Sequence, residues 1–264
     1  MKMDQLRHQT VTRYIAPLRE GGSLPLLVEA DDGFRYAAKL RGSGHGPKVL
    51  AAEIIGGEVA RATGLLVPEL VFLELDEDFG RTEPDEEVQD LMQSSRGLNL
   101  GMHFLEGALS IDPYINAIDA ETASRIVWTD AFLTNIDRTL RNTNMLLWHG
   151  RETWLIDHGA SLYFHHSWSD PEKAALSPFP YIKDHALLHL ASRLEETDSL
   201  MRQRLTPELL AAIVELVTDA WAARPDLGLS AAEIKQGYIT FLQTRLANSR
   251  IFAQSAIDAR KAII

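Results

Sequence analysis

Hydrophobic positions in the first hundred residues fall into short runs that alternate with polar positions and are separated by turn residues. Such runs predict strands, because successive side chains of a strand point to opposite faces of a sheet. The first three strands, joined by tight turns, are expected to pair antiparallel. The strands are expected at 12–18, 24–30, 34–41, 66–75 and 97–105. The acidic stretch 76–90 between the last two is predicted to be a solvated excursion.

A helix is expected between the third and fourth strands, over residues 49–63. Ala52, Ile55 and Val59 recur there at helical spacing, so that they share one face of the helix. Gly64 follows at the position where a C-terminal cap belongs. The first part of the chain therefore predicts a β-rich region with one helix inserted into it.

Hydrophobic residues recur mainly at helical spacing from Asp119 onward, and this aspartate stands where an N-terminal cap is expected. One β-hairpin interrupts the helical pattern, with strands at 145–148 and 153–156 and a four-residue connection at 149–152. Further helices are expected at 120–133, 184–195, 207–223 and 231–247. The seam between the two patterns lies near residues 103–118.

These elements predict an α+β fold of two lobes. Residues 1–105 are expected to form a β-rich N-terminal lobe, and residues 106–264 a mainly helical C-terminal lobe. No internal repeat or low-complexity tract interrupts this organisation.

Composition limits the classes of protein that the chain can belong to. The chain has 264 residues, 45% of them hydrophobic, which suits a globular protein with a buried core. It contains no cysteine, which excludes disulfides, thiolate metal sites and cysteine nucleophiles. The net charge of −11 opposes nucleic acids and anionic membranes, so neither is an expected partner. The polar N-terminus and the lack of a membrane-spanning apolar run lead us to expect a cytoplasmic protein.

Three oxygen-bearing side chains flank the predicted hairpin. Asn142 stands just before its first strand and Asp157 just after its second, so antiparallel pairing should bring them together. Asp137 lies on the loop that enters the hairpin. An amide and a carboxylate suit Mg²⁺ on a nucleotide, and Asp137 would then orient or deprotonate an attacking hydroxyl. Taken singly, each of the three residues is better explained as a turn former than as a ligand, and the hypothesis depends on their combined order along the chain.

The segments that carry these residues, DRTLRN at 137–142 and LIDHG at 155–159, resemble the catalytic and metal-binding motifs of HipA-like kinases. They resemble those of phosphatidylinositol kinases more distantly. The resemblance implies a bilobal kinase-like fold that uses ATP and Mg²⁺. It also implies that Asp137 is the catalytic aspartate, that Asn142 and Asp157 are the Mg²⁺ ligands, and that the acceptor is a serine or threonine of a protein. His158 stands where the family usually has phenylalanine.

A kinase needs a cation on the nucleotide phosphates, and Lys39 on the third predicted strand is the candidate. A lysine within an apolar strand needs a partner, which Glu53 or Glu58 of the following helix would supply. Glu53 is preferred, because the helix of the resembled family carries its glutamate early. The alternative is that Lys39 lies on an edge strand and points into water.

Two glycine-rich loops are candidates for nucleotide binding. Gly21, Gly22 and Ser23 stand where a phosphate-covering loop is expected, although a simple hairpin turn explains the glycines as well. By the resemblance, Ser23 corresponds to a regulatory autophosphorylation site. The second loop, GSGHGPK at 42–48, matches neither the dinucleotide-binding nor the P-loop template. It is the only support for an alternative, an oxidoreductase that binds NAD(H).

Four histidines outside the hairpin are candidates for a metal site. His185 and His189 are spaced four apart on the helix expected at 184–195, and His165 and His166 follow the hairpin. Without thiols or a third spaced ligand, structural or surface roles are favoured. No G-x-S-x-G motif supports serine-hydrolase chemistry.

Some properties of HipA-like proteins are not expected here. The chain is too short for their additional N-terminal subdomain and has no basic helix-turn-helix segment, so toxin function and operator binding are not carried over. The segment 160–181 is expected to face the substrate, and the protein acceptor is unidentified. The alternatives are a nucleotide-binding regulator without catalysis and, less favoured because of the acidic charge, a lipid or small-molecule kinase.

Overall fold

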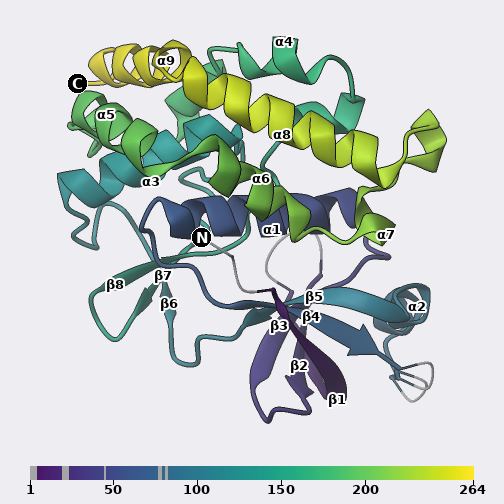
Figure 1. Cartoon of the computed structure of the whole chain (residues 1–264). Coiled ribbons are helices and arrows are strands. Elements are labelled where there is room, and N and C mark those ends of the chain that lie inside the picture. Colours follow the sequence, from purple (N-terminus) through teal and green to yellow (C-terminus); the bar gives the residue numbers. More distant parts are fainter. Residues whose placement is uncertain (1–4, 20–23, 45, 77–78, 81–82) are drawn as a thin grey trace. The chain divides into compact units, whose positions relative to one another are not determined.

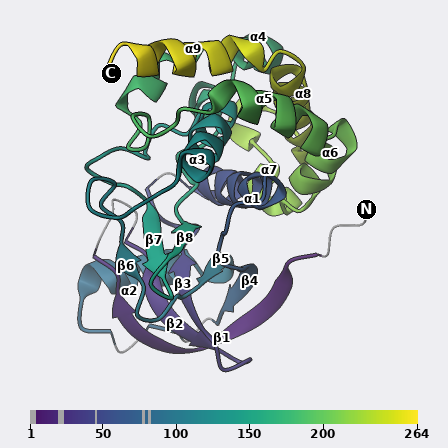
Figure 2. The same ribbon diagram turned by 90° about the vertical axis from the view of Figure 1, so that its left-hand side faces the viewer.

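The computed structural model describes residues 5–19, 24–44, 46–76, 79–80 and 83–264 (Figures 1 and 2). These residues form two compact units. One, here called the barrel unit, consists of the described residues within Asp4–Leu50 and Pro68–Glu106. The other, here called the helical unit, joins Ala51–Val67 to Gly107–Ile264. The first helix of the chain is thus grouped mainly with residues that follow it at a distance in the sequence.

The barrel unit is built on a closed barrel in which the strand order is β1-β2-β3-β5-β4. Its strands are β1 (Arg7–Pro17), β2 (Leu26–Ala30), β3 (Arg35–Lys39), β4 (Leu70–Leu75) and β5 (Gly97–His103). The first three strands pair antiparallel, as predicted. The start of β1 also pairs with β4 in parallel, which closes the barrel and extends β1 beyond its predicted start at residue 12. The core is lined by Val11, Leu26, Val28, Tyr36, Ala38, Val71 and Leu73.

Two predictions in this unit were wrong in part. The fourth strand begins at Leu70, not at residue 66, because Pro68 has no N–H group to donate to a ladder. The stretch 76–90 was predicted to be solvated, but α2 (Glu86–Ser94) begins within it. Asp85 caps this helix, and Val88 and Met92 are buried in the barrel core. Their four-residue spacing was masked by the surrounding acidic residues.

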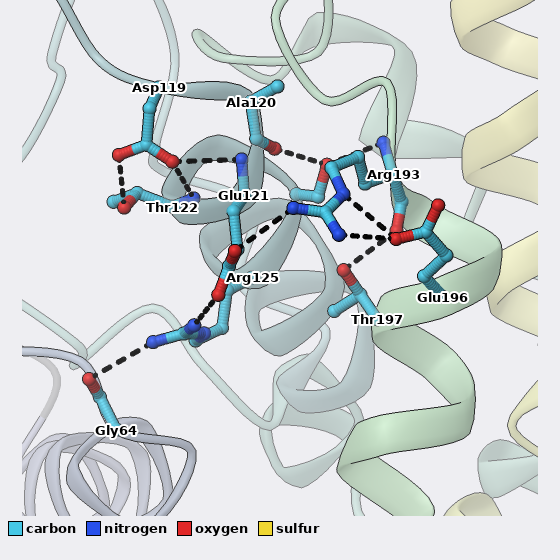
Figure 3. A network of polar contacts seen from close by, with 10 residues as sticks. Gly64, Asp119, Ala120, Glu121, Thr122, Arg125, Arg193, Glu196 and Thr197 are labelled. Carbon is cyan, nitrogen blue, oxygen red and sulfur yellow. Dashed lines mark hydrogen bonds and ion pairs between the residues drawn. The ribbon is translucent and has the colours of Figure 1, made fainter.

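The helical unit begins within α1 (Pro47–Ala62), the helix predicted at 49–63. A second helix, α3 (Ala120–Leu133), follows the sequence prediction closely, and its N-terminal cap is the expected Asp119. Figure 3 shows how polar contacts join the first turn of α3 to its neighbours. Glu121 receives Arg125 Nη2 at 2.7 Å and Arg193 Nη1 at 3.0 Å, while Arg125 also reaches the carbonyl of Gly64. The start of α3 is thereby tied to the turn after α1 and to the start of α5.

The helical unit contains further helices. They are η1 (Tyr163–Ser167), α4 (Pro171–Ala175), η2 (Pro180–Asp184), α5 (Leu194–Arg204), α6 (Pro207–Glu215), α7 (Asp219–Ala222), η3 (Pro225–Leu227), α8 (Ala231–Ala247) and α9 (Arg250–Lys261). Of these, α5, α8 and α9 pack against α3. Helix α8 has the predicted bounds and packs against α3, α4, α6 and α7 (Figures 1 and 2). Among the described helices, none is both long enough and apolar enough to cross a membrane.

Two helix predictions were wrong. The segment 184–195 is a series of turns, and α5 begins only at Leu194. His185 is drawn out of helical geometry because its backbone forms a bridge with Thr139 and its ring contacts Asp130. The helix predicted at 207–223 ends at Glu215, because Thr218 is extended and begins the separate helix α7.

The predicted hairpin is present as β7 (Met145–Trp148) and β8 (Glu152–Leu155), with the short strand β6 (Leu109–Ser110) beside β7. Its connection is one residue shorter than predicted, because Glu152 already pairs with Trp148. The backbone of Leu155 donates to the carbonyl of Leu66 at 2.8 Å, which attaches the hairpin to the segment after α1.

Candidate active site

The loop between α3 and β7 carries the candidate catalytic residue. Helix α3 ends at Leu133 and is capped by Thr134, which takes the left-handed conformation with φ 54° and turns the chain out of the helix. Asp137 follows, and its Oδ2 accepts two amide hydrogen bonds. Asn142 Nδ2 lies at 3.0 Å from it and Asn144 Nδ2 at 3.2 Å. Within the part of the chain that the structure describes, Oδ1 of Asp137 receives no hydrogen bond, so one oxygen is held and the other is available for a ligand.

The protonation equilibrium of Asp137 reflects its surroundings. Burial raises the pKa of this carboxyl above its ordinary value, and the negative charge of Asp157 raises it further. The two amides act in the opposite direction, because they donate to the ionised form. Two neighbouring carboxylates of like charge favour binding of a cation between or beside them.

A buried ion pair connects the loop that carries Asp137 to helix α3. Arg138 is fully buried, and its Nε donates to Asp130 Oδ2 of α3 at 2.6 Å. Asp130 also accepts from Asn135 Nδ2 at 2.9 Å. Burial alone would raise the pKa of Asp130, but the positive charge of Arg138 and the contact with His185 outweigh it and lower that pKa. The aspartate is therefore ionised and holds Asn135 and Arg138 of the loop on α3.

His185 completes this buried cluster in its neutral form. Its Nδ1 accepts the backbone N–H of Leu187 at 3.0 Å, so the proton resides on Nε2, which lies 3.0 Å from Asp130 Oδ2. Burial lowers the pKa of His185, in agreement with this arrangement. The ring acts as a hydrogen-bond donor to Asp130. A structural or surface role was predicted for His185, and its buried contacts give it a structural one. Its predicted place on a helix was wrong.

The segment after β8 packs closely on α1. Asp157 has φ 56°, a left-handed conformation that is uncommon outside glycine, asparagine and aspartate. The next residue, His158, is buried, and its Nδ1 lies 3.9 Å from Glu53 Oε1. A Cβ added to Gly56 of α1 would lie 2.7 Å from His158 Cβ and 3.1 Å from Ser161 Oγ. The absence of a side chain at Gly56 therefore permits this close packing.

The residues present fit a magnesium ion bound through a nucleotide. Asn142 directs its Nδ2 at Asp137, so its Oδ1 points away and can serve as an oxygen ligand. Asp157 supplies a carboxylate near enough to influence Asp137. The described residues contain no cluster of three or more histidine, aspartate or glutamate side chains suited to a metal. One carboxylate and one amide suffice where phosphates and water complete the shell.

The candidates for phosphate binding in the N-terminal region are Lys39 and the loop residues Gly21, Gly22 and Ser23. Lys39 is buried at the end of β3, which pairs with both β2 and β5, so the alternative of an edge-strand lysine in water was wrong. Its pairing with a glutamate stays a prediction. Gly21, Gly22 and Ser23 lie outside the described residues.

The two candidate glutamates of α1 have different surroundings. Glu53 is fully buried beside His158. Glu58 receives Arg61 Nε at 3.3 Å within the same helix, and Arg61 also donates to the carbonyl of Val67. Glu58 is therefore already engaged locally.

The loop at 42–48 does not form a dinucleotide-binding motif. Such a motif requires a parallel strand before its helix, whereas β3 pairs antiparallel with both of its neighbours. Gly42 in this loop packs against Ser94 and Ser95, and its backbone N–H donates to Ser95 Oγ at 3.0 Å. The oxidoreductase alternative has lost its only support.

The segment 160–181 is held on the helical unit by aromatic side chains. Phe164 stacks on Phe241 of α8 with ring centroids 4.3 Å apart, and Trp168 packs edge-on against Tyr238. His165 Nδ1 lies 3.1 Å from the Tyr238 hydroxyl, which gives this histidine a structural role. The segment therefore has a defined conformation next to the candidate catalytic loop, and the backbone N–H of Tyr163 donates to the Thr134 hydroxyl at 3.2 Å.

Arg245 of α8 binds the carbonyl groups near the end of the segment 160–181. It is fully buried, and its guanidinium donates to the carbonyls of Ala131, Ala175 and Ser177, each at 2.8 Å. Burial lowers its pKa to about 9. Phe252 lies under the guanidinium at 4.6 Å. One cation thus connects the C-terminal turns of α3 and α4.

Sequence reasoning missed Asn144 and Asp130. Asn144 contacts the candidate catalytic carboxylate directly, and Asp130 holds the loop through its ion pair with Arg138. A second asparagine two residues after Asn142 was a visible signal, because both amides precede the same strand. Asp130 carried no comparable signal, since it lies among apolar residues of a helix and its partner His185 is distant in sequence.

Comparisons with known proteins bear on the family and the fold of this chain. A family model described as HipA-like kinase matches residues 11–252. Among solved structures, the proinflammatory kinase CtkA of Helicobacter pylori has a TM-score of 0.51 and 13% identity, covering 94% of this chain and 98% of that chain. The MAP kinase LmaMPK10 of Leishmania major has a TM-score of 0.31 and 12% identity, covering 97% and 84%. No curated protein matches the chain significantly.

Proposed function

The chain belongs to the family of HipA-like kinases and has a kinase-like α+β fold, and on that premise we propose that it transfers the γ-phosphate of ATP to a serine or threonine hydroxyl of a protein. The observation that carries this proposal is the state of Asp137. Two amides hold one of its oxygens while the other is available to an acceptor, and a second carboxylate, Asp157, lies nearby.

Asp137 acts on the acceptor hydroxyl. Its held carboxylate accepts the hydroxyl hydrogen bond and directs the oxygen toward the γ-phosphorus. It takes up the proton as the new O–P bond forms and the bond between the γ-phosphorus and the β-phosphate oxygen breaks, so that ADP leaves. The raised pKa of this carboxyl, caused first by burial, makes it a better proton acceptor than an exposed aspartate. Correct orientation of the acceptor is the main contribution expected from this residue.

Asn142 and Asp157 would hold Mg²⁺ on the nucleotide. When bound, the ion neutralises phosphate charge and offsets the repulsion between the two aspartates. Asn142 serves both sides, since its Nδ2 donates to Asp137 while its Oδ1 points away from that carboxylate. Lys39 is assigned to the α- and β-phosphates with Glu53 as its partner, because Glu58 is engaged by Arg61. Gly21, Gly22 and Ser23 are assigned to the loop over the phosphates.

The experiment compares the wild-type protein with Asp157→Ala, using ATP labelled in the γ-phosphate, Mg²⁺ and a cell lysate as the source of acceptors. Nucleotide affinity is measured separately by titration. Loss of Asp157 is expected to reduce transfer by at least about a hundredfold, because metal ligation and phosphate positioning fail together. Phosphoamino-acid analysis of the labelled product tests the serine or threonine assignment.

The possible results of this experiment distinguish the proposed function from its alternatives. Label transferred by the wild type alone supports phosphotransfer. Mg²⁺-dependent ATP binding without transfer would instead favour a nucleotide-binding regulator, and label found in the lipid fraction would favour a lipid kinase. A wild-type protein that does not bind ATP at all would overturn the proposed function.

A further inference from the structure

The second amide at the candidate catalytic carboxylate has no counterpart in the three-residue motif from which the site was predicted. Asn144 Nδ2 contacts Asp137 twice, at 3.2 Å from the carboxylate Oδ2 and at 3.4 Å from the backbone carbonyl. Asn142 reaches the same Oδ2 at 3.0 Å. The two amides differ in their surroundings, because Asn142 is exposed and Asn144 is buried. An exposed amide reorients readily, whereas a buried one loses much of that freedom.

Two hydrogen bonds to its carbonyl fix the backbone of Asn144. Its carbonyl accepts Arg138 Nη1 and the N–H of Ile156, the latter at 3.1 Å. Arg138 is in turn held by Asp130 at 2.6 Å in the interior of the helical unit. A continuous series of polar contacts therefore runs from α3 through Arg138 and Asn144 to the carboxylate of Asp137. Each contact in it is buried or partly buried, which limits the competition from water.

The backbone conformation at position 144 also favours asparagine. Asn144 has φ 48°, in the left-handed region where asparagine and glycine are better tolerated than most residues. Glycine would also adopt this backbone conformation, but it has no side-chain amide to donate to the carboxylate of Asp137. Asparagine satisfies the backbone and the carboxylate together.

We propose that Asn144 is a positioning residue, whose buried amide holds Oδ2 of Asp137 so that Oδ1 faces the acceptor hydroxyl. The inference rests on the proposed function of Asp137 and goes beyond it. Asn142 must turn its oxygen toward the metal ion, and its hold on Asp137 then depends on the geometry around that ion. Asn144 holds the carboxylate independently of the metal.

The test compares Asn144→Gly and Asn144→Asp with the wild type. Glycine keeps the left-handed backbone and removes the amide, while aspartate keeps the size and shape but cannot donate when ionised. His149→Gly is the matched control, because His149 also has a left-handed backbone, with φ 49°, but lies in the exposed hairpin turn. ADP production from Mg²⁺-ATP is measured, since this reaction uses water as acceptor and needs no identified protein substrate.

Both variants at position 144 are expected to lower kcat about tenfold to a hundredfold, as for the loss of a hydrogen bond to a charged group. The KM for ATP is expected to stay within about twofold, because Asn144 is not assigned to the nucleotide. A purely structural role would lower the melting temperature and the fraction of active protein, and the latter also lowers the apparent kcat at an unchanged KM. The value of kcat is therefore expressed per ATP-binding site, counted by titration, and a purely structural role would leave that value at the wild-type level.

Other outcomes overturn the inference. Wild-type kcat in Asn144→Gly or Asn144→Asp would show that the amide does not position Asp137, even if the kinase proposal stands. An equal loss in His149→Gly would attribute the effect to glycine in the backbone. A wild-type protein with no Mg²⁺-dependent ADP production, and no transfer to any acceptor, would remove the proposed function and this inference with it.

Discussion

The packing of Gly56 against the segment after Asp157 leads to a prediction with a magnitude that follows from the structure. In Gly56→Ala the new Cβ would lie 2.7 Å from His158 Cβ. Ordinary contacts between such atoms lie at 3.4–4 Å, so the two elements must separate by roughly 1 Å. His158 Cβ is attached directly to the backbone and cannot rotate away, so the backbone next to Asp157 must move.

This displacement is expected to affect catalysis more than stability. Alanine in a helix interior is favoured over glycine by about 1 kcal/mol, whereas overpacking a core costs about 1–3 kcal/mol. The net loss of unfolding free energy is therefore about 0–2 kcal/mol. A misplacement of about 1 Å at a catalytic group can lower the rate about a hundredfold. Because Asp157 is assigned to the metal, the Mg²⁺ concentration for half-maximal ADP production should rise as well.

The assay measures ADP production as a function of Mg²⁺, together with thermal unfolding. Gly237→Ala is the matched control, since it is also an interior helical glycine and its new Cβ would lie 2.6 Å from the ring of Trp168. It should lower the melting temperature comparably and leave the Mg²⁺ requirement unchanged. If Gly56→Ala kept the wild-type rate and the wild-type Mg²⁺ requirement, the coupling of this glycine to the metal site would be refuted.

Two further predictions concern buried groups of the helical unit. Burial holds the pKa of His185 below its ordinary 6.5, so the unfolded state binds the extra proton first. Its contribution to stability is complete above about pH 6.5 and is lost as the pH falls toward the lowered folded pKa. Urea unfolding of His185→Asn, which cannot titrate, should therefore depend less on pH between about 7.5 and 5.5, and equal slopes would implicate another group. Arg245→Met should lose about 2–4 kcal/mol of unfolding free energy, because the carbonyls of Ala131, Ala175 and Ser177 lose their donor. Denaturant unfolding measures this loss, and a wild-type midpoint would contradict it.

Local patterns were sufficient for much of this molecule. The alternating runs predicted the five strands, and helical spacing predicted α1, α3 and α8. The cap at Asp119 also followed from residue type alone. These features depend on neighbours within a few residues, which is the range over which a sequence pattern carries information.

The pair Asp137 and Asn142 was also accessible to sequence reasoning. The four residues between them form a tight loop, and the structure joins their side chains at 3.0 Å. The catalytic and metal-binding roles of these residues and of Asp157 stay predictions, and they rest on the motif and on the family.

Tertiary structure alone decided what surrounds these residues. Asp130 and His185 are 55 positions apart, and their contact turned a segment with helical spacing into turns. Gly56 and His158 meet only when α1 packs beside the hairpin. The physical reason is that long-range contacts depend on the packing of whole elements, and many distant pairs are equally compatible with the same local pattern. The sequence by itself therefore determined the elements and the candidate chemistry, while tertiary packing decided which buried groups hold that chemistry in position.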